Sequence, residues 1–322
     1  MSYCNRRRGG VTRVELLVVM TIIVVFLTAL IPVILAAREA SNRTACAQNL
    51  RQLGLVVHNY HDINGALPPL YSRAFSDSGA FTYEDAPSWA VFLLPYMEHR
   101  AAWEELVINQ SVTNNTITAA GGGGRTNLKN LSAMRTSAFN CPTRGRRTVT
   151  LAGEMWQTSD YVPLFTSNVT NSAGELVVWD GRKKNWTGMI APPLSSAPTS
   201  SGLISRTTFN SVTDGLSFTA MFGEKHMGRD WLGSRSLDYP VLPFQADYRS
   251  IRTTGLALTK TLREGSDGAS TVPARMQFGS WHPGYTTFCF GDTSIKLVKN
   301  YTSVTALKRM TGRADALPYD LP

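Results

Sequence analysis

The hydrophobic pattern near the start of the chain begins with a long uncharged stretch. Residues 16–37 consist of Leu, Val, Ile, Ala, Met, Phe and Thr with a single Pro, and none of them is charged. A helix that rises about 1.5 Å per residue crosses a hydrocarbon core of roughly 30 Å in about 20 residues. The stretch therefore predicts a membrane-spanning helix. A signal peptide cleaved after Ala37 is the alternative, although its apolar region is usually only about 7 to 15 residues long.

Beyond residue 37 the helical pattern continues but becomes two-sided. Apolar positions recur at spacings of three and four, which is typical of an amphipathic helix with one face packed on a folded domain. Gly65, followed by Pro68 and Pro69, marks the end of this helix, because glycine caps helix ends and proline cannot continue one. The apolar positions of the predicted buried face are Cys46, Leu50, Leu53, Val57 and Tyr60.

The rest of the chain changes from a helical to a strand-like pattern. Residues 88–107 predict a helix, or short helices, interrupted by Pro95. Short β-rich runs separated by Gly, Pro, Asn and Ser follow. An antiparallel sheet packed on the long helix is the simplest solution, so the expected fold class is α+β. The predicted strands are residues 159–165, 176–179, 219–223, 277–281, 286–291 and 295–298, and the predicted surface loops are residues 114–124 and 191–202.

The charge distribution predicts which side of the membrane the chain occupies. Arg6, Arg7 and Arg8 precede the apolar stretch, and basic residues beside a span stay in the cytoplasm. We therefore expect the residues after the span to lie outside the cytoplasm. The net charge is +9, but the later basic residues form only short runs such as 144–147, so we expect no nucleic-acid partner.

A short motif joins the basic residues to the span. Gly10 is followed by Val11, and Glu15 stands at the edge of the apolar stretch. This arrangement resembles the processing site of type IV pilins and type II secretion pseudopilins. The resemblance implies that a prepilin peptidase cuts after Gly10, that Val11 becomes an N-methylated amino terminus, and that Glu15 pairs with the amino terminus of a neighbouring subunit. Val11 and Arg13 stand where the family usually has Phe and Leu.

Further segments resemble a large pilin-like family of unknown function. Its C-terminal motif is a histidine, nine residues and Asp-Gly; His282 and Asp292 keep this spacing, whereas Thr293 replaces the glycine expected in a left-handed turn. A His–carboxylate pair suggests a ligand site or a hydrogen bond that locks a hairpin, and the lack of a nucleophile motif favours the second. The other matching segments are residues 38–40, 46–54, 58–62, 68–69, 139–142, 212–219 and 223–224.

The cysteines predict one covalent link in the exported part. Cys4 lies in the leader, and an oxidising compartment permits the others to form a disulfide. We predict a disulfide between Cys46 and Cys141, which would join the helix to the head, and a buried free thiol at Cys289. The alternative is three separate buried thiols.

These patterns divide the chain into four predicted parts, and few residues in them suggest a catalytic or metal-binding site. The parts are a leader (1–10), a membrane-spanning half-helix (11–37), an amphipathic half-helix (38–63) and an extracytoplasmic head (64–322). His58 and His61 share a helical face, but two histidines do not make a metal site, and we expect no metal or other cofactor. The chain has no His-Glu-x-x-His, Gly-x-Ser-x-Gly or phosphate-binding glycine motif, so we expect no enzyme.

The main hypothesis is a pseudopilin-like assembly subunit, single-pass in the inner membrane, with its head in the periplasm or extracellular space. Its partners would be prepilin peptidase, the lipid bilayer, and other pilin-like subunits or copies of itself in an oligomer or filament. A hydrolase that uses His282 and Asp292 is a minority hypothesis. The alternative is a membrane-tethered module that binds glycans or small solutes, which an aromatic groove would favour. The candidates for such a groove are Trp156, Trp179, Trp186 and Trp231.

Overall fold

The computed structural model of the protein has two compact units, residues 1–44 and 45–322. The leader, Val11 and the predicted strand 176–179 lie outside the described residues, as do 114–115, 120–124 and 192–202 of the predicted loops. The described residues are 12–70, 86–101, 103–104, 110–113, 116–119, 132, 134–151, 153–165, 187–191, 207–228, 231–234, 238, 240–244, 252–253, 277–314, 316 and 319.

Helix α1 (Arg13–Asn64) begins in the first unit. A capping box caps its N-terminus. The Thr12 backbone N–H donates to Glu15 Oε2 at 2.8 Å, and the Glu15 backbone N–H donates to Thr12 Oγ1 at 3.2 Å. The apolar side chains that follow are exposed. In the part of the chain that the structure describes, α1 is the one helix long and apolar enough to cross a membrane, with a window of mean hydropathy 3.0.

The second half of α1 belongs to the head and buries the predicted face. Cys46, Leu50, Leu53 and Val57 are fully buried and Tyr60 is 3% exposed, which confirms the face predicted from spacing. The helix ends at Asn64, and Gly65 follows with a φ of +68°. This left-handed conformation favours glycine and ends the helix as expected.

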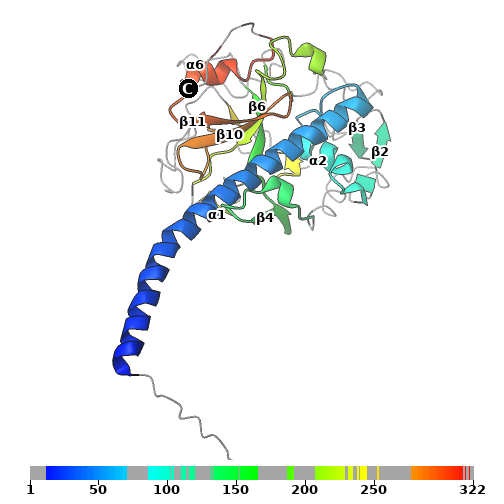
Figure 1. Ribbon diagram of the computed structural model, residues 1–322. Coiled ribbons are helices and arrows are strands. Elements are labelled where there is room, and N and C mark those ends of the chain that lie inside the picture. The colour runs from blue at the N-terminus through cyan, green and yellow to red at the C-terminus, as the bar shows by residue number, and fades with distance from the viewer. Residues whose placement is uncertain are drawn as a thin grey trace, which may run out of the picture. The chain divides into compact units, whose positions relative to one another are not determined.

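A five-stranded sheet forms the centre of the head (Figure 1). Its order is β11-β10-β7-β6-β9, and all neighbours are antiparallel except β6 and β9. Four of the predicted strands are confirmed within a few residues, as β6, β7, β10 and β11. The strands are β6 (Tyr161–Phe165), β7 (Ala220–Glu224), β9 (Arg252–Thr253), β10 (Tyr285–Phe290) and β11 (Ile295–Lys299).

The predicted strand at residues 277–281 is wrong. Phe278 makes only an isolated bridge with Lys225. The next residue, Gly279, donates its N–H to the Glu224 carbonyl and accepts a hydrogen bond from the Arg144 guanidinium. A side chain therefore takes the carbonyl that a neighbouring strand would need, and the segment stays irregular.

Two helices cover the faces of the sheet, so the predicted α+β fold class is confirmed. On one face α1 approaches so closely that a Cβ on Gly54 would lie 2.8 Å from Cys289 Sγ. On the other face Phe288 and Phe290 of β10 share a core with Leu307 of α6 (Val304–Arg309). Alternate residues of β10 thus contribute to different cores, as the two-residue period of a strand requires. Figure 1 shows α1 crossing the head beside the sheet.

Shorter elements surround this framework. The region predicted as helical from 88 begins with α2 (Trp89–Leu93) and continues, at Pro95, as the 3-10 helix η2 (Leu94–Tyr96). Residues 116–119, predicted as loop, instead form a strand paired with 110–113. The remaining elements are β1 (Ala86–Pro87) paired with β8 (Pro243–Phe244), β2 (Gln110–Thr113) with β3 (Thr116–Ala119), β4 (Thr148–Leu151) with β5 (Glu154–Gln157), and the 3-10 helices η4 (Ser137–Phe139) and η6 (Phe209–Ser211).

Candidate functional site

A buried disulfide joins α1 to the turn that follows η4. Cys46 and Cys141 are bonded, with their Cα atoms 5.2 Å apart, and this is the pairing predicted from the sequence. Asn49, one turn along α1, donates hydrogen bonds to the carbonyls of Ser137 and Asn140 at 3.2 and 3.0 Å. The two cysteines are 95 positions apart, and for a loop of this length the chain-entropy model gives a stabilisation of about 4.7 kcal/mol.

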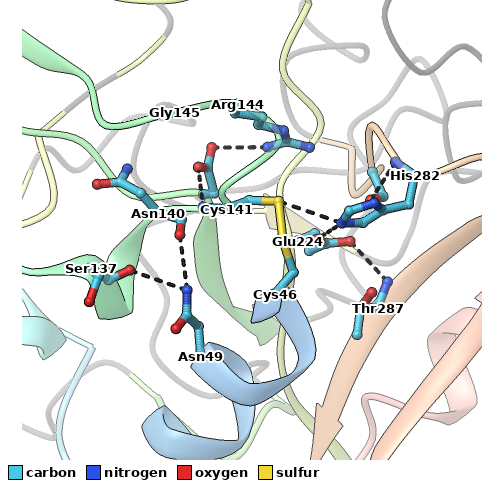
Figure 2. Close-up of a disulfide and its surroundings, with 12 residues drawn as sticks. Cys46, Asn49, Ser137, Asn140, Cys141, Arg144, Gly145, Glu224, His282 and Thr287 are labelled. Atoms are coloured by element: carbon cyan, nitrogen blue, oxygen red, sulfur yellow. Dashed lines mark hydrogen bonds and ion pairs between the residues drawn. A yellow bond between two sulfur atoms is a disulfide. The ribbon is translucent and has the colours of Figure 1, made fainter. Parts of the chain in front are cut away.

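A histidine and a carboxylate lie against this disulfide (Figure 2). His282 Nε2 is 3.5 Å from Cys141 Sγ and 3.8 Å from Glu224 Oε1. Glu224 Oε2 accepts the backbone N–H of Thr287 at 3.1 Å, whereas Oε1 has no hydrogen bond to any described residue. Both side chains are buried. The arrangement is a buried polar cluster of two sulfurs, one imidazole and one carboxylate.

Four separate parts of the fold supply these groups. Cys46 comes from α1 and Cys141 from a turn, while Glu224 is the last residue of β7. His282 lies in the turn before β10, where its backbone N–H donates to Ser280 Oγ at 3.1 Å. Because β7 and β10 are hydrogen-bonded neighbours, the end of one strand and the start of the other meet beside the helix.

A buried charged cluster lies next to the disulfide. The Cys141 N–H donates to Asp160 Oδ2 at 2.8 Å, and the other oxygen of Asp160 contacts Arg144 and Arg147 at 3.1 and 2.6 Å. Asp238 pairs with Arg147 at 2.7 Å and with Lys225 at 3.0 Å. The sequence shows only that Arg144 and Arg147 belong to a short basic run, and it does not show that these arginines pair with buried acids.

The charged cluster keeps its acids ionised. Burial by itself would raise the pKa of Asp160, but Arg147 and Arg144 outweigh it and lower the pKa to about 2. The pKa of Asp238 is also lowered: burial opposes ionisation, while Lys225 and Arg147 favour it. The cluster therefore stays charged at neutral pH and holds the turn that carries Cys141 in place.

The structure does not bring His282 and Asp292 together. They flank opposite ends of β10, whose six residues extend over roughly 20 Å. Asp292 Oδ1 accepts the Ser294 N–H at 2.9 Å in the turn between β10 and β11, and Thr293 keeps a left-handed φ of +66° there. The suggested pairing of these two side chains is therefore wrong, because an extended strand separates them. His282 does face a carboxylate, but it is Glu224.

Other candidate residues take part in packing. His58 stacks on Phe209 and the tilted ring of His61 also contacts it, with centroid distances of 4.3 and 4.4 Å. His58 Nε2 lies 2.7 Å from the Gly291 carbonyl oxygen. Trp156 and Trp231 are 4% and 3% exposed, so these two do not form the exposed aromatic groove that a sugar-binding module would need. Gly10, Val11, Trp179 and Trp186 lie outside the described residues.

One comparison with known proteins assigns the chain to a family. The model of a family described as "Protein of unknown function (DUF1559)" matches residues 35–303. The chain belongs to this family. The DUF1559 match begins at the end of the apolar stretch and covers both cysteines, Glu224 and His282. No curated protein and no solved structure matches the chain. The head, together with the amphipathic part of α1, is therefore what this protein shares with the DUF1559 family, and the apolar helix is compatible with a single-pass membrane anchor.

Proposed function

We propose that this DUF1559-family protein is a pseudopilin-like assembly subunit of a type II secretion or type IV pilus-like system. It is made as a precursor, cut after Gly10 by a prepilin peptidase, and held in the inner membrane by its apolar helix with the head outside the cytoplasm. The observation that carries the proposal is the register of the N-terminal motif. Three arginines, Gly10 and Glu15 stand in order immediately before an uncharged span.

The start of α1 supports this proposal. The capping box between Thr12 and Glu15 starts α1 at Arg13, so cleavage after Gly10 leaves only two residues before the helix. In a bundle of parallel helices, an amino terminus at this position is available to the Glu15 carboxylate of a neighbouring subunit. Such pairing offsets the cost of a charge at the edge of the membrane.

The exposed span supports assembly within a membrane. Side chains such as Val25 and Phe26 are 66% and 65% exposed, and no described residue buries the apolar window of α1. An apolar surface of this extent is unfavourable in water. Lipid or the helices of other subunits are the environments that cover it.

The head supports a structural role rather than catalysis. His282 and Glu224 are 1% and 0% exposed, so a substrate has no access to them in this conformation. His282 and Asp292, the pair that a hydrolase would use, lie at opposite ends of β10. A binding module for glycans or small solutes loses the support that exposed Trp156 and Trp231 would have provided.

The decisive experiment is the mass of the N-terminal peptide of the protein from native membranes. We expect a peptide that begins at Val11 and carries one methyl group on its amino terminus. An intact Met1 would contradict processing and leave a plain anchored protein. A terminus after Ala37 would contradict the membrane anchor as well.

A further inference from the structure

We propose that Cys46, Cys141, Glu224 and His282 form a zinc site when the two cysteines are reduced. Their ligand atoms all lie within 4.8 Å of one another, and all four residues are buried. The proposal does not depend on the function proposed above, because it concerns the head alone. The disulfide and the zinc site use the same two sulfurs, so they are alternative states of one centre.

The donor set fits zinc. Two thiolates, an imidazole nitrogen and a carboxylate oxygen are all ligands that Zn²⁺ uses in tetrahedral sites. Zinc–ligand bonds of about 2.0 to 2.3 Å place such ligand atoms roughly 3.3 to 3.8 Å apart. His282 Nε2 already lies 3.5 Å from Cys141 Sγ and 3.8 Å from Glu224 Oε1. Breaking the disulfide and separating its two sulfurs is the main movement required.

The carboxylate provides an independent observation. Glu224 is fully buried, and its Oε1 has no hydrogen bond to any described residue, although buried polar atoms normally have a partner. Its Oε2 is held by the Thr287 N–H at 3.1 Å. A ligand carboxylate in a metal site has the same arrangement, with one oxygen hydrogen-bonded to the protein and the other directed at the ion. Figure 2 shows Glu224 beside His282 and the disulfide.

The chemistry of the switch balances with a dithiol as the reductant. The dithiol transfers two electrons and two protons to the Cys46–Cys141 bond, which yields two thiols and a new disulfide on the dithiol. Zinc binding then releases the two thiol protons. Both sulfurs are buried, so a folded head exchanges slowly with a dithiol. The choice between disulfide and zinc is therefore made as the head folds.

The test uses the full chain synthesised cell-free into detergent micelles, in metal-free buffer with a phosphine reductant. Co²⁺ is the probe, because it takes tetrahedral zinc sites and absorbs strongly when thiolates bind it. We expect one cobalt per chain, with a thiolate charge-transfer band that equimolar Zn²⁺ removes. The same protein folded under oxidising conditions is expected to show no such band.

Three variants identify the ligands. His282→Ala and Glu224→Gln are expected to weaken cobalt binding by about tenfold or more, whereas Cys289→Ser, which removes the other buried thiol, leaves it unchanged. The proposal is overturned if the reduced head keeps its near-UV circular dichroism but shows no thiolate band, or if His282→Ala binds like the wild type. Where the reduced head loses that signal without metal, zinc is expected to restore it, and failure to do so also overturns the proposal.

Discussion

At the scale of single residues, Asp160 shows how buried charge contributes to stability. Its pKa is about 2 in the folded head and 3.8 in the unfolded chain. Because the pKa is lower in the folded state, ionised Asp160 stabilises the fold above pH 3.8, and this stabilisation is lost as the pH falls through 2. The contribution to the free energy of unfolding is about 2 kcal/mol. We expect the free energy of unfolding in urea to fall by about this amount between pH 4 and pH 2.

The matched variant Asp160→Asn isolates this carboxylate. It removes the titrating group, so the decrease between pH 4 and pH 2 becomes smaller by about 2 kcal/mol. At pH 7 the variant is less stable by about 3 to 5 kcal/mol, because the buried charges of Arg144 and Arg147 lose the Asp160 carboxylate, although Arg147 keeps its ion pair with Asp238. An unchanged pH dependence in the variant would show that Asp160 is not the source.

At the scale of elements, the contact between α1 and β10 depends on Gly54. A methyl group at this position would lie 2.8 Å from Cys289 Sγ and 3.4 Å from Thr293 Cγ2. Alanine favours a helix over glycine by about 1 kcal/mol, but overpacking a core costs roughly 1 to 3 kcal/mol. We expect Gly54→Ala to lower the free energy of unfolding in urea by up to about 2 kcal/mol.

The source of this loss is tested with a double-mutant cycle. In a Cys289→Ala background the sulfur is absent, so Gly54→Ala is expected to cost less than in the wild type. The difference between the two costs is the coupling energy of the pair. Equal costs in both backgrounds would mean that the helix approaches the sheet differently from the structure.

At the scale of the whole molecule, the proposed function gives Glu15 a role in assembly. It caps the first turn of α1, and glutamine can occupy the same place in a capping box. The proposed function requires the charge itself, so Glu15→Gln and Glu15→Val should both abolish oligomers that chemical cross-linking detects in native membranes. Cleavage after Gly10 is expected to continue in both variants.

The pair of Glu15 variants separates three outcomes. A subunit that needs only the cap would assemble with glutamine and fail with valine. A tethered binding module would reach the membrane and behave like the wild type with either substitution. Loss of cross-linked oligomers in both variants, with the head still folded, is the result that the pseudopilin-like role predicts.

The sequence alone determined the features that depend on local patterns. The uncharged span, the buried face of α1 and the glycine that ends it follow from helical spacing and from the conformations open to glycine. Strands β6, β7, β10 and β11 follow from short apolar runs between turns. The segment at 277–281 has a similar composition, yet it makes only an isolated bridge with Lys225, and the Gly279 carbonyl accepts from Arg144, which no local pattern shows.

Only the tertiary structure decided which polar groups meet. His282 lies beside Glu224, 58 positions earlier in the chain, rather than beside Asp292. The extended strand β10 separates His282 from Asp292, whereas the pairing of β7 with β10 places Glu224 next to His282. The charged cluster likewise joins Arg144, Asp160 and Asp238 from separate segments. Such contacts depend on strand order and register, which are set by the packing of the whole head and leave no periodic signal in the sequence.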